Sequence, residues 1–354
     1  MMRSRGVRLP YGAPRRRRTD AMSIDTIRDL IEIPGIWERM DRVEERLLDV
    51  SRAGDDFLTE IAQHLLVAGG KRYRPVLTQL AGEFGPTRDR RLIEAGAAVE
   101  LIHIGSIYHD DVMDGADTRR GTTSVNARWD NSLAILAGDF LIARASEIAA
   151  TYLGMASVEL LAHTYRELVT GQALELRLTG GVSHGPADHY RVIGGKTASL
   201  IRTAARLGAL AADAAAGTVE AVSTATWELG MVFQMTDDAL DLVSTEEDLG
   251  KPAGSDIRQG VYTLPVLYAL EGPDGSRIAS LLQEEGPVTE DVVEEVIGLV
   301  KEGGYVHRVL DECRHRLARA AAATAGLPDI EARAVFRRMG EFLVDRVGTV
   351  GASY

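Results

Sequence analysis

Apolar residues along most of the chain recur at the three- and four-residue steps of an amphipathic helix. In residues 36–50, Ile36, Met40, Val43 and Leu47 follow this period, which places their side chains on one face of a helix. Alternating strand patterns bounded by tight turns are scarce. The same period predicts helices over further ranges: 92–109, 131–150, 155–176, 196–212, 218–243, 262–271, 288–302, 305–325 and 329–348. The pattern therefore predicts an all-α protein.

Glycine, proline and serine mark the connections between these helices, for example at 180–181, 184–186 and 326–328. No linker or internal repeat divides the chain, so we predict one large helical domain over residues 23–354. Some helices are apolar on more than one face, as in 131–145, which is typical of helices inside a bundle. Polar residues inside such helices are candidates for function.

The composition is that of a globular protein with a sizeable core. Of 354 residues, 45% are apolar and 26% are charged, and no apolar run is long enough to predict a transmembrane segment. The net charge of −12 argues against broad nucleic-acid binding, so an anionic substrate would need a local cationic site. The single cysteine, Cys313, excludes an intrachain disulfide framework and favours a cytoplasmic location.

The first twenty residues differ from the rest in charge. They contain seven arginines and one acidic residue, Asp20, and so carry +6, which leaves −18 for the remainder. This segment could be a basic tail, a targeting segment or sequence translated upstream of a true start at Met22; it lacks the apolar core of a secretory signal. We expect residues 1–22 to be a disordered, dispensable tail.

Two clusters of aspartates share one form, in which the first and last carboxylates are four residues apart. They are Asp110-Asp111-Asp114 and Asp237-Asp238-Asp241. Each follows an apolar helical run, and residues four apart share a helix face, where like charges repel. A divalent cation would offset this repulsion, and ligands made of oxygen alone suit Mg²⁺. One such cluster is more often an acidic helix end facing water, but two of the same form favour a metal site.

Cationic residues accompany these clusters in glycine-containing segments. They are Lys71, Arg74, Arg119, Arg120, Lys196 and Lys251. Glycine lets the backbone approach a phosphate closely, arginine offers a bidentate donor pair and lysine a point charge. Each taken singly is more often a solvated surface charge, and neither GxxxxGK[ST] nor GxGxxG is present. Carboxylates for several metal ions beside separate cations indicate a site for two diphosphates, because metal ions remove the repulsion between diphosphate and carboxylate.

Several longer motifs together resemble the trans-isoprenyl diphosphate synthase, or polyprenyl synthetase, family. They are GGKRYRP, HDDVMD, RRG, GDFL, GGKTASL, FQMTDDALD and GKPAGSDIRQGVYTLP, and they cover residues 69–265 in the family's order and spacing. The resemblance implies a single helical bundle of the isoprenoid synthase type with a central catalytic cavity, and a homodimer. It also implies a Mg²⁺-dependent trans-prenyltransferase that joins isopentenyl diphosphate to an allylic diphosphate and releases a longer prenyl diphosphate.

The resemblance implies roles for residues at matching positions. Isopentenyl diphosphate would be held by Lys71, Arg74, His103 and Arg120. The allylic diphosphate would be held by Arg119, Lys196 and Lys251. Three Mg²⁺ ions would be held by Asp110, Asp111 and Asp114 and by Asp237, Asp238 and Asp241. Thr197 and Gln234 would face the developing carbocation. The residues expected to act in catalysis are Asp110, Asp114, Asp237, Lys196, Thr197 and Gln234.

In the implied reaction the allylic diphosphate ionises with the help of Mg²⁺, and the double bond of isopentenyl diphosphate attacks the cation. A proton then leaves, to the departed diphosphate, since no side chain is an obvious base. One position departs from the family pattern: Val261 stands where many members have lysine, which removes one diphosphate contact. Because the other cations are present, we expect the activity to be retained.

Product length depends, in the family, on a tunnel below the first aspartate cluster. Gly105 and Ser106 precede Asp110 by five and four residues, which is roughly 6–8 Å along the helix. Neither side chain is large, so we predict an open tunnel and a product of about thirty carbons or more, of the kind used for quinone tails. The alternative is that Gly105 serves helix packing and the enzyme makes farnesyl or geranylgeranyl diphosphate.

Two other classes of protein share part of this pattern. A terpene cyclase of the same helical class has a first aspartate motif but usually lacks a second one and the GGKRYRP segment. A non-catalytic partner subunit tends to lose its aspartates, whereas both clusters are intact here. The sequence therefore favours the synthase over both.

Overall fold

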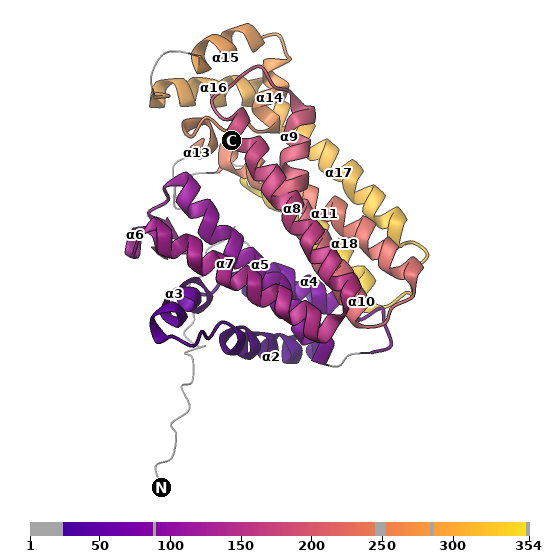
Figure 1. The fold of residues 1–354 in the computed structure, drawn as a ribbon. Helices are drawn as coiled ribbons and strands as arrows, with labels where there is room; N and C mark the ends of the chain where they lie inside the picture. The colour runs from indigo at the N-terminus through magenta and orange to yellow at the C-terminus, as the bar shows by residue number, and fades with distance from the viewer. Residues whose placement is uncertain (1–23, 88–89, 245–252, 284–286, 352–354) are drawn as a thin grey trace.

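The computed structural model describes residues 24–87, 90–244, 253–283 and 287–351. Within these ranges nearly all regular structure is helical (Figure 1), which confirms the predicted all-α class. Two of the sequence predictions, the basic tail 1–22 and the role of Lys251, fall outside the described residues.

Long helices form the body of the protein. They are α2 (Pro34–Val50), α5 (Arg90–Asp114), α7 (Asn131–Ile148), α8 (Met155–Leu178), α10 (Ser199–Ala211), α11 (Ala216–Val243), α17 (Tyr305–Thr324) and α18 (Glu331–Gly351). Shorter helices are α1 (Ile24–Leu30), α3 (Asp56–Val67), α4 (Tyr73–Gly82), α6 (Val125–Arg128), α9 (Pro186–Ile193), α13 (Ser255–Arg258), α14 (Leu264–Leu270), α15 (Gly275–Leu282) and α16 (Glu290–Glu302). The described ranges also contain two π-helical turns, η1 (Ala149–Leu153) and η2 (Gly194–Ala198), and an antiparallel hairpin of β1 (Thr118–Arg119) and β2 (Thr122–Thr123).

Every helical range predicted from the apolar period coincides with an observed helix, within a few residues at each end. The range 262–271 is shortened at its start because Thr263 is extended and Pro265 occupies the first turn of α14. The prediction missed short helices such as α3, whose apolar period is brief. The Asp55 side chain caps α3 by accepting the Leu58 N–H at 2.8 Å.

Helix α5 runs through the interior, where it packs against α2, α4, α7 and α10. It is buried on every side along most of its length, as expected for a helix that is apolar all round. Its two buried glutamates are paired: Glu94 with Arg46 at 2.9 Å and Glu100 with Arg72 at 3.1 Å. Such pairing is what permits a charge inside a core. The first aspartate cluster ends this helix.

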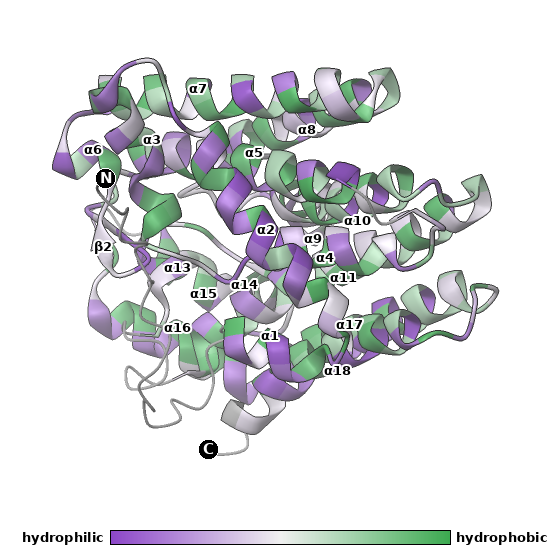
Figure 2. Cartoon of the chain, turned by 90° about the horizontal axis from the view of Figure 1, so that it is seen from below, coloured by the Kyte–Doolittle hydropathy of each residue, from purple (hydrophilic) through white to green (hydrophobic). Residues whose placement is uncertain are grey.

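Helix α11 is the second central helix and carries the second aspartate cluster. It packs against α10, α17 and α18, while α10 also packs against α4 and α5. Figure 1 shows the long helices running side by side, with α13, α14, α15 and α16 gathered at one end. In Figure 2, α7 and α8 form one edge of the bundle, and α17 and α18 form the opposite edge. One cluster of buried apolar side chains extends from Ile27 to Val347.

None of the helices in the described ranges combines the length and the apolar character needed to cross a bilayer.

Candidate active site

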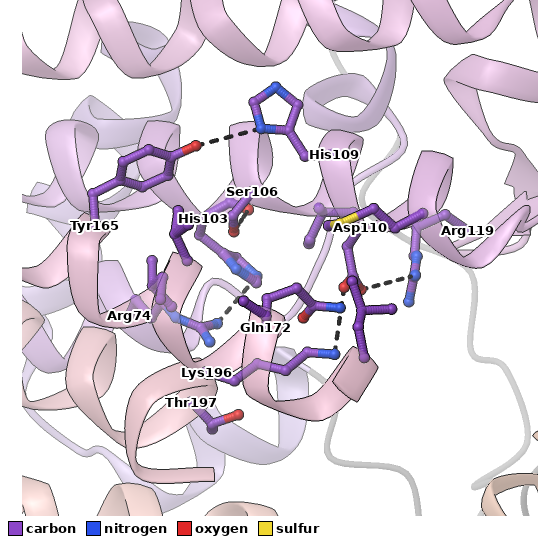
Figure 3. A pocket seen from close by; sticks show the side chains of 16 residues that line it. Arg74, His103, Ser106, His109, Asp110, Arg119, Tyr165, Gln172, Lys196 and Thr197 are labelled. Atoms are coloured by element: carbon purple, nitrogen blue, oxygen red, sulfur yellow. Dashed lines mark hydrogen bonds and ion pairs between the residues drawn. The ribbon is translucent and has the colours of Figure 1, made fainter. Parts of the chain in front are cut away.

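A cleft of about 500 Å³ opens between α5, α8 and η2 (Figure 3). Six residues expected from the sequence line it: Arg74, His103, Asp110, Arg119, Lys196 and Thr197. The rest of the wall is largely apolar and includes Ile107, Leu168, Val169 and Leu176. Charged groups and a hydrocarbon surface therefore meet in one cavity.

The first aspartate cluster lies in the last turn of α5. Asp110 borders the cleft, where its carboxylate oxygens are 3.4 Å from Nζ of Lys196 and 3.7 Å from Nη2 of Arg119. Asp114 is exposed one helical turn later, on the same face. Asp111 is buried, and its Oδ1 accepts from Nε of Arg119 at 2.6 Å. Asp110 therefore faces the cleft, Asp114 is exposed one turn beyond it, and Asp111 holds Arg119.

The electrostatics of this cluster suit a metal ion. Partial burial raises the pKa of Asp114, and the charges of Asp110 and Glu175 raise it further. Burial also raises the pKa of Asp111, although Arg119 opposes the shift. The second oxygen of Asp111, Oδ2, is buried and has no hydrogen-bond partner among the described residues. A divalent cation would relieve this crowding of carboxylates.

The described carboxylates do not form a complete set of metal ligands by themselves. Among the residues that the structure describes, no three acidic, histidine or cysteine side chains are grouped closely enough to hold a metal ion. Cations stand between them: Lys196 is paired with Asp110 and Glu175, and Arg119 with Asp111. The donors are oxygen atoms of the kind that Mg²⁺ prefers, with room for substrate phosphates and water to complete the set.

Arg74 of α4 and His103 of α5 form a second polar group in the cleft, with Nη1 of the guanidinium 3.0 Å from Nε2 of the ring. Burial, followed by the charges of Arg74 and Arg120, lowers the pKa of His103 well below its usual value. The ring is therefore neutral at pH 7, and its Nε2 accepts from Arg74. Burial lowers the pKa of Arg74 to about 10, which leaves it cationic.

Arg120 and Lys71 lie beside the cleft and are not among the residues that line it. Arg120 donates to the backbone carbonyl of Leu65 in α3 at 3.1 Å and to that of Gly69, which follows α3. Desolvation lowers the pKa of Lys71; Asp237 opposes this shift and Arg346 adds to it. Neither cation therefore lines the open cavity, although both were predicted to bind isopentenyl diphosphate.

The three aspartates of the second cluster have different surroundings. Asp237 is paired with Arg346, a buried residue of the C-terminal helix α18. Asp241 accepts the backbone N–H of Asp256 at 3.0 Å. Asp238 is buried, and both of its carboxylate oxygens lie within hydrogen-bond distance of side chains on α9 and α11. Asp237 is thus held by a side chain of opposite charge.

The π-helical turn η2 presents Lys196 and Thr197 to the cleft. Although burial acts against it, the charges of Asp110 and Glu175 raise the pKa of Lys196. Thr197 donates its hydroxyl hydrogen to Oε1 of Gln234 at 2.8 Å. Gln234 itself is not among the residues lining the cleft, so it lies behind Thr197. Its predicted contact with the carbocation is therefore indirect in this structure.

The close approach of α8 to η2 depends on two glycines. A Cβ atom on Gly171 would lie 2.6 Å from the backbone nitrogen of Lys196, and one on Gly195 would lie 2.9 Å from the carbonyl oxygen of Glu167. No other residue type fits at this distance, since backbone atoms cannot move aside as side chains do. This contact brings Lys196 within reach of Glu175 on α8.

The sequence analysis overlooked several residues of the site. Gln172 and Glu175 belong to the segment GQALE of α8. A polar pair beside a glycine was a weak signal, because the same helix carries other charged residues such as Arg166 and Glu167. Gln172 lines the cleft, and its amide nitrogen is buried with no hydrogen-bond partner in the described part of the chain. Arg346 and His189 had no such signal, because only folding brings them to the second cluster.

Residues near the predicted product tunnel behave differently from one another. Ser106 lines the cleft, as expected. Gly105 does not, because it faces α7, where a Cβ atom would lie 2.8 Å from the carbonyl oxygen of Gly138. Gly105 therefore serves helix packing and does not shape the cleft wall, so the expectation of an open tunnel rests on Ser106. Tyr108 points to α3 and donates to the carbonyl of Ile61 at 2.9 Å.

Val261, at the position where many family members have lysine, does not line the cleft; it borders a separate, smaller hollow.

Comparison with known proteins agrees with this geometry. The chain belongs to the polyprenyl synthetase family, whose model matches residues 55–300. It is 40% identical over 311 residues to a nonaprenyl diphosphate synthase of Mycobacterium tuberculosis, covering 87% of this chain and 92% of that one. It is also 40% identical over 306 residues to a heptaprenyl diphosphate synthase component 2 of Geobacillus stearothermophilus, covering 86% of this chain and 94% of that one.

Solved structures agree as well. A geranylgeranyl pyrophosphate synthase of Corynebacterium glutamicum, solved with calcium and isoprenyl diphosphate, superposes with a TM-score of 0.79 and 40% identity, over 89% of this chain and 96% of that one. The protein is therefore a trans-prenyltransferase with the helical isoprenoid synthase fold, and the resemblance, fold class and enzyme class predicted from the sequence are confirmed.

Proposed function

We propose that the protein is a long-chain all-trans polyprenyl diphosphate synthase, which joins isopentenyl diphosphate to an allylic diphosphate in this cleft. The observation that carries the proposal is the convergence of two cationic groups on one cavity: Arg74 with His103, and Lys196 with Arg119. Two such groups suit two anionic substrates. The apolar wall of the same cavity suits a growing hydrocarbon chain.

Each cationic group has a role in binding. Arg74, desolvated and held by neutral His103, would take the diphosphate of isopentenyl diphosphate, with Lys71 and Arg120 close by. Lys196 and Arg119, which neutralise acids of the first cluster in the free protein, would turn to the allylic diphosphate. Attraction between opposite charges is strengthened in a cleft that excludes water.

The aspartates are the residues that would hold Mg²⁺. Asp110 and Asp114 suit the first cluster, with Glu175 beside them, and Asp237 and Asp241 suit the second. Bound Mg²⁺ would supply Lewis-acid stabilisation of the leaving diphosphate. Three ions per site remain part of this proposal. Asp238, whose two oxygens already face protein side chains, is better suited to holding its neighbours in place.

The remaining steps concern the chain's own side chains. Thr197 presents its hydroxyl oxygen to the cleft, where it would face the positive charge that develops on the allylic carbon. Leu168, Val169 and Leu176 would keep water from that carbon. Among the described residues that line the cleft, Asp110 is paired with Lys196, His103 with Arg74 and His109 with the Ile135 carbonyl. We therefore expect the proton to leave to the departed diphosphate.

A long product is supported by Ser106, which leaves the cleft wall open below Asp110, and by the similarity to a nonaprenyl diphosphate synthase. The similarity to a geranylgeranyl pyrophosphate synthase keeps a shorter product as the second candidate. A cytoplasmic location is also part of the proposal, in keeping with a buried free cysteine, Cys313.

A homodimer is the assembly we propose. Helices α7 and α8 form one edge of the bundle (Figure 2). Each carries exposed apolar side chains: Ile135 (44% exposed) and Leu136 (58%) on α7, and Val169 (52%) and Leu176 (49%) on α8. The latter two border the cleft, so a second copy on this edge would bury all four and close the opening. The similarity to a heptaprenyl diphosphate synthase component 2 makes a different subunit the alternative. Light scattering on the purified chain separates the two.

The activity is tested by incubating the protein with Mg²⁺, labelled isopentenyl diphosphate and allylic primers of different lengths, and sizing the dephosphorylated products. A ladder ending at about thirty carbons or beyond is expected, given the open wall at Ser106. Asp110→Ala and Asp237→Ala should each lower turnover by roughly a hundredfold or more, whereas Asp41→Ala, at an exposed position on α2, should not. A folded protein that elongates no primer contradicts the proposal.

A further inference from the structure

A chain of hydrogen bonds connects the cleft to the interior behind the second aspartate cluster. Thr197 Oγ1 donates to Oε1 of Gln234 at 2.8 Å, and Nε2 of Gln234 donates to Oδ1 of Asp238 at 2.8 Å. The other oxygen of Asp238, Oδ2, is 2.8 Å from Nε2 of His189. The four residues come from η2, α11 and α9, and Thr197 is the member that lines the cleft.

The chemistry of the donors and acceptors fixes the direction of this chain. An ionised carboxylate can only accept, so the amide of Gln234 must turn its NH₂ group toward Asp238. Its carbonyl oxygen then faces Thr197 and accepts the single hydroxyl hydrogen. The lone pairs of the Thr197 hydroxyl oxygen are consequently free to point into the cleft. If Gln234 were turned over, its NH₂ would meet Thr197 and drive that hydrogen toward the cleft.

The burial of the last two members makes the arrangement costly to break. Asp238 is 3% exposed and His189 is 6% exposed. A buried polar group that loses its partner is destabilised by roughly 1–3 kcal/mol, so the network favours one fully paired arrangement. Both oxygens of Asp238 are engaged by protein groups. In contrast, Asp237 is held by Arg346, which a metal ion and a diphosphate could replace.

We propose that His189 and Asp238 are positioning residues, which hold Gln234 so that Thr197 turns its oxygen lone pairs toward the reacting carbon. The inference rests on the proposed function, because that carbon carries positive charge only in a prenyl transfer that begins with ionisation. Lone pairs stabilise such a charge and an O–H hydrogen repels it. His189 would thus affect the reaction through two intervening residues without touching either substrate.

The proposal assigns Asp238 a role different from that of its neighbours in the same cluster, and this difference can be measured. Asp238→Asn keeps an oxygen to accept from Gln234, and its NH₂ can donate to Nε2 of His189 once the ring changes tautomer. We expect this variant to retain turnover within about threefold. Asp238→Ala should lower kcat by roughly 10–100-fold with little change in KM for either diphosphate.

Metal dependence is the readout that separates positioning from metal binding. In Asp238→Asn and Asp238→Ala, the Mg²⁺ concentration for half-maximal rate and the Mg²⁺ affinity measured by calorimetry should match the unmodified protein. Asp110→Asn should weaken both strongly, since it removes a charge that faces the cleft. An Asp238→Asn variant that loses Mg²⁺ affinity as Asp110→Asn does would overturn the proposal and make Asp238 a metal ligand.

His189 is tested by coupling it to Thr197. His189→Ala should lower kcat roughly tenfold in the unmodified protein, but less than about twofold in a Thr197→Val background, where no hydroxyl remains to be oriented. His189→Gln, which carries a donor nitrogen at a similar reach, should recover most of the loss. His184→Ala provides a matched control, because His184 borders the same small hollow as His189 but has no part in the network.

Each outcome has a distinct meaning. His189→Ala could lower kcat equally in the unmodified and the Thr197→Val backgrounds and also lower stability in urea titrations. That result would show that His189 serves only the packing of α9, and it would overturn the inference. If the unmodified protein elongates every primer but the effects of His189 and Thr197 on kcat are independent, the proposed function stands and the inference alone fails. An unmodified protein without prenyl transfer removes both.

Discussion

Ser106 offers the sharpest test of how the cleft sets product length. It lies four residues before Asp110 on α5, about 6 Å along the helix axis, and its side chain lines the cleft. Ser106→Phe would place an aromatic ring in the path of the growing chain. Since the cleft holds about 500 Å³, one added ring removes a substantial part of the space below the aspartates.

The expected effect follows from the hydrophobic free energy of each five-carbon unit. Burying one unit against apolar walls contributes roughly 4 kcal/mol at about 0.8 kcal/mol per carbon. A unit that the ring excludes from the cleft stays exposed to water and loses this contribution. The loss favours release over another condensation by roughly several hundredfold or more. We therefore expect Ser106→Phe to end the product ladder at about fifteen to twenty carbons, with the first condensation little changed.

The assay is product sizing after incubation with a fifteen-carbon primer and labelled isopentenyl diphosphate. Ser106→Ala is the matched control and should leave the ladder unchanged, since it removes only a hydroxyl that donates to the carbonyl of His103 at 2.8 Å. Gly105→Ala provides a second comparison. Its Cβ would press on the Gly138 carbonyl, so it should lower stability by roughly 1–3 kcal/mol without shortening the product. A ladder in Ser106→Phe that matches the unmodified protein would refute this reasoning.

Three further predictions concern charge and packing. Arg346→Gln should tighten Mg²⁺ binding to the substrate-free protein about tenfold by calorimetry, because it removes a cation paired with Asp237; Arg337→Gln, exposed on the same helix, should not. The lowered pKa of His103 predicts a loss of stability as pH falls from 7 to 5, because the unfolded ring (pKa about 6.5) takes up a proton that the native ring does not. This loss is at most about 2 kcal/mol, and a pH series of urea titrations should show it absent in His103→Gln. Gly171→Ala should displace Lys196 and lower kcat at least tenfold, so a fully active Gly171→Ala enzyme would contradict this expectation. Gly298→Ala is the control: because open space surrounds Gly298, the change should leave the free energy of unfolding unchanged or raise it.

The sequence by itself determined the helices and the inventory of charged groups. It did not determine every helix position: the segment 131–145 was predicted to lie inside the bundle, whereas α7 forms one edge with Ile135 and Leu136 exposed. Helices α5 and α11 were predictable because an apolar period sustained over many residues leaves few alternatives to a buried helix. The placement of aspartates four apart was also a local property, since the geometry of a helix puts such residues on one face. Arg74, Asp110 and Lys196 were found because they stand in contiguous motifs, and His103 because it matches a family position seven residues before Asp110.

Only the tertiary structure decided which of these groups meet and which way they point. Gly105 and Ser106 are adjacent on one helix, yet one packs on α7 and the other lines the cleft, because successive helical residues point in directions about 100° apart. The three aspartates of the second cluster look alike in the sequence. They differ in the fold because Arg346 and His189, 109 and 49 residues distant from their partners, reach them only through helix packing. Such contacts depend on the relative placement of whole helices, which no local pattern specifies.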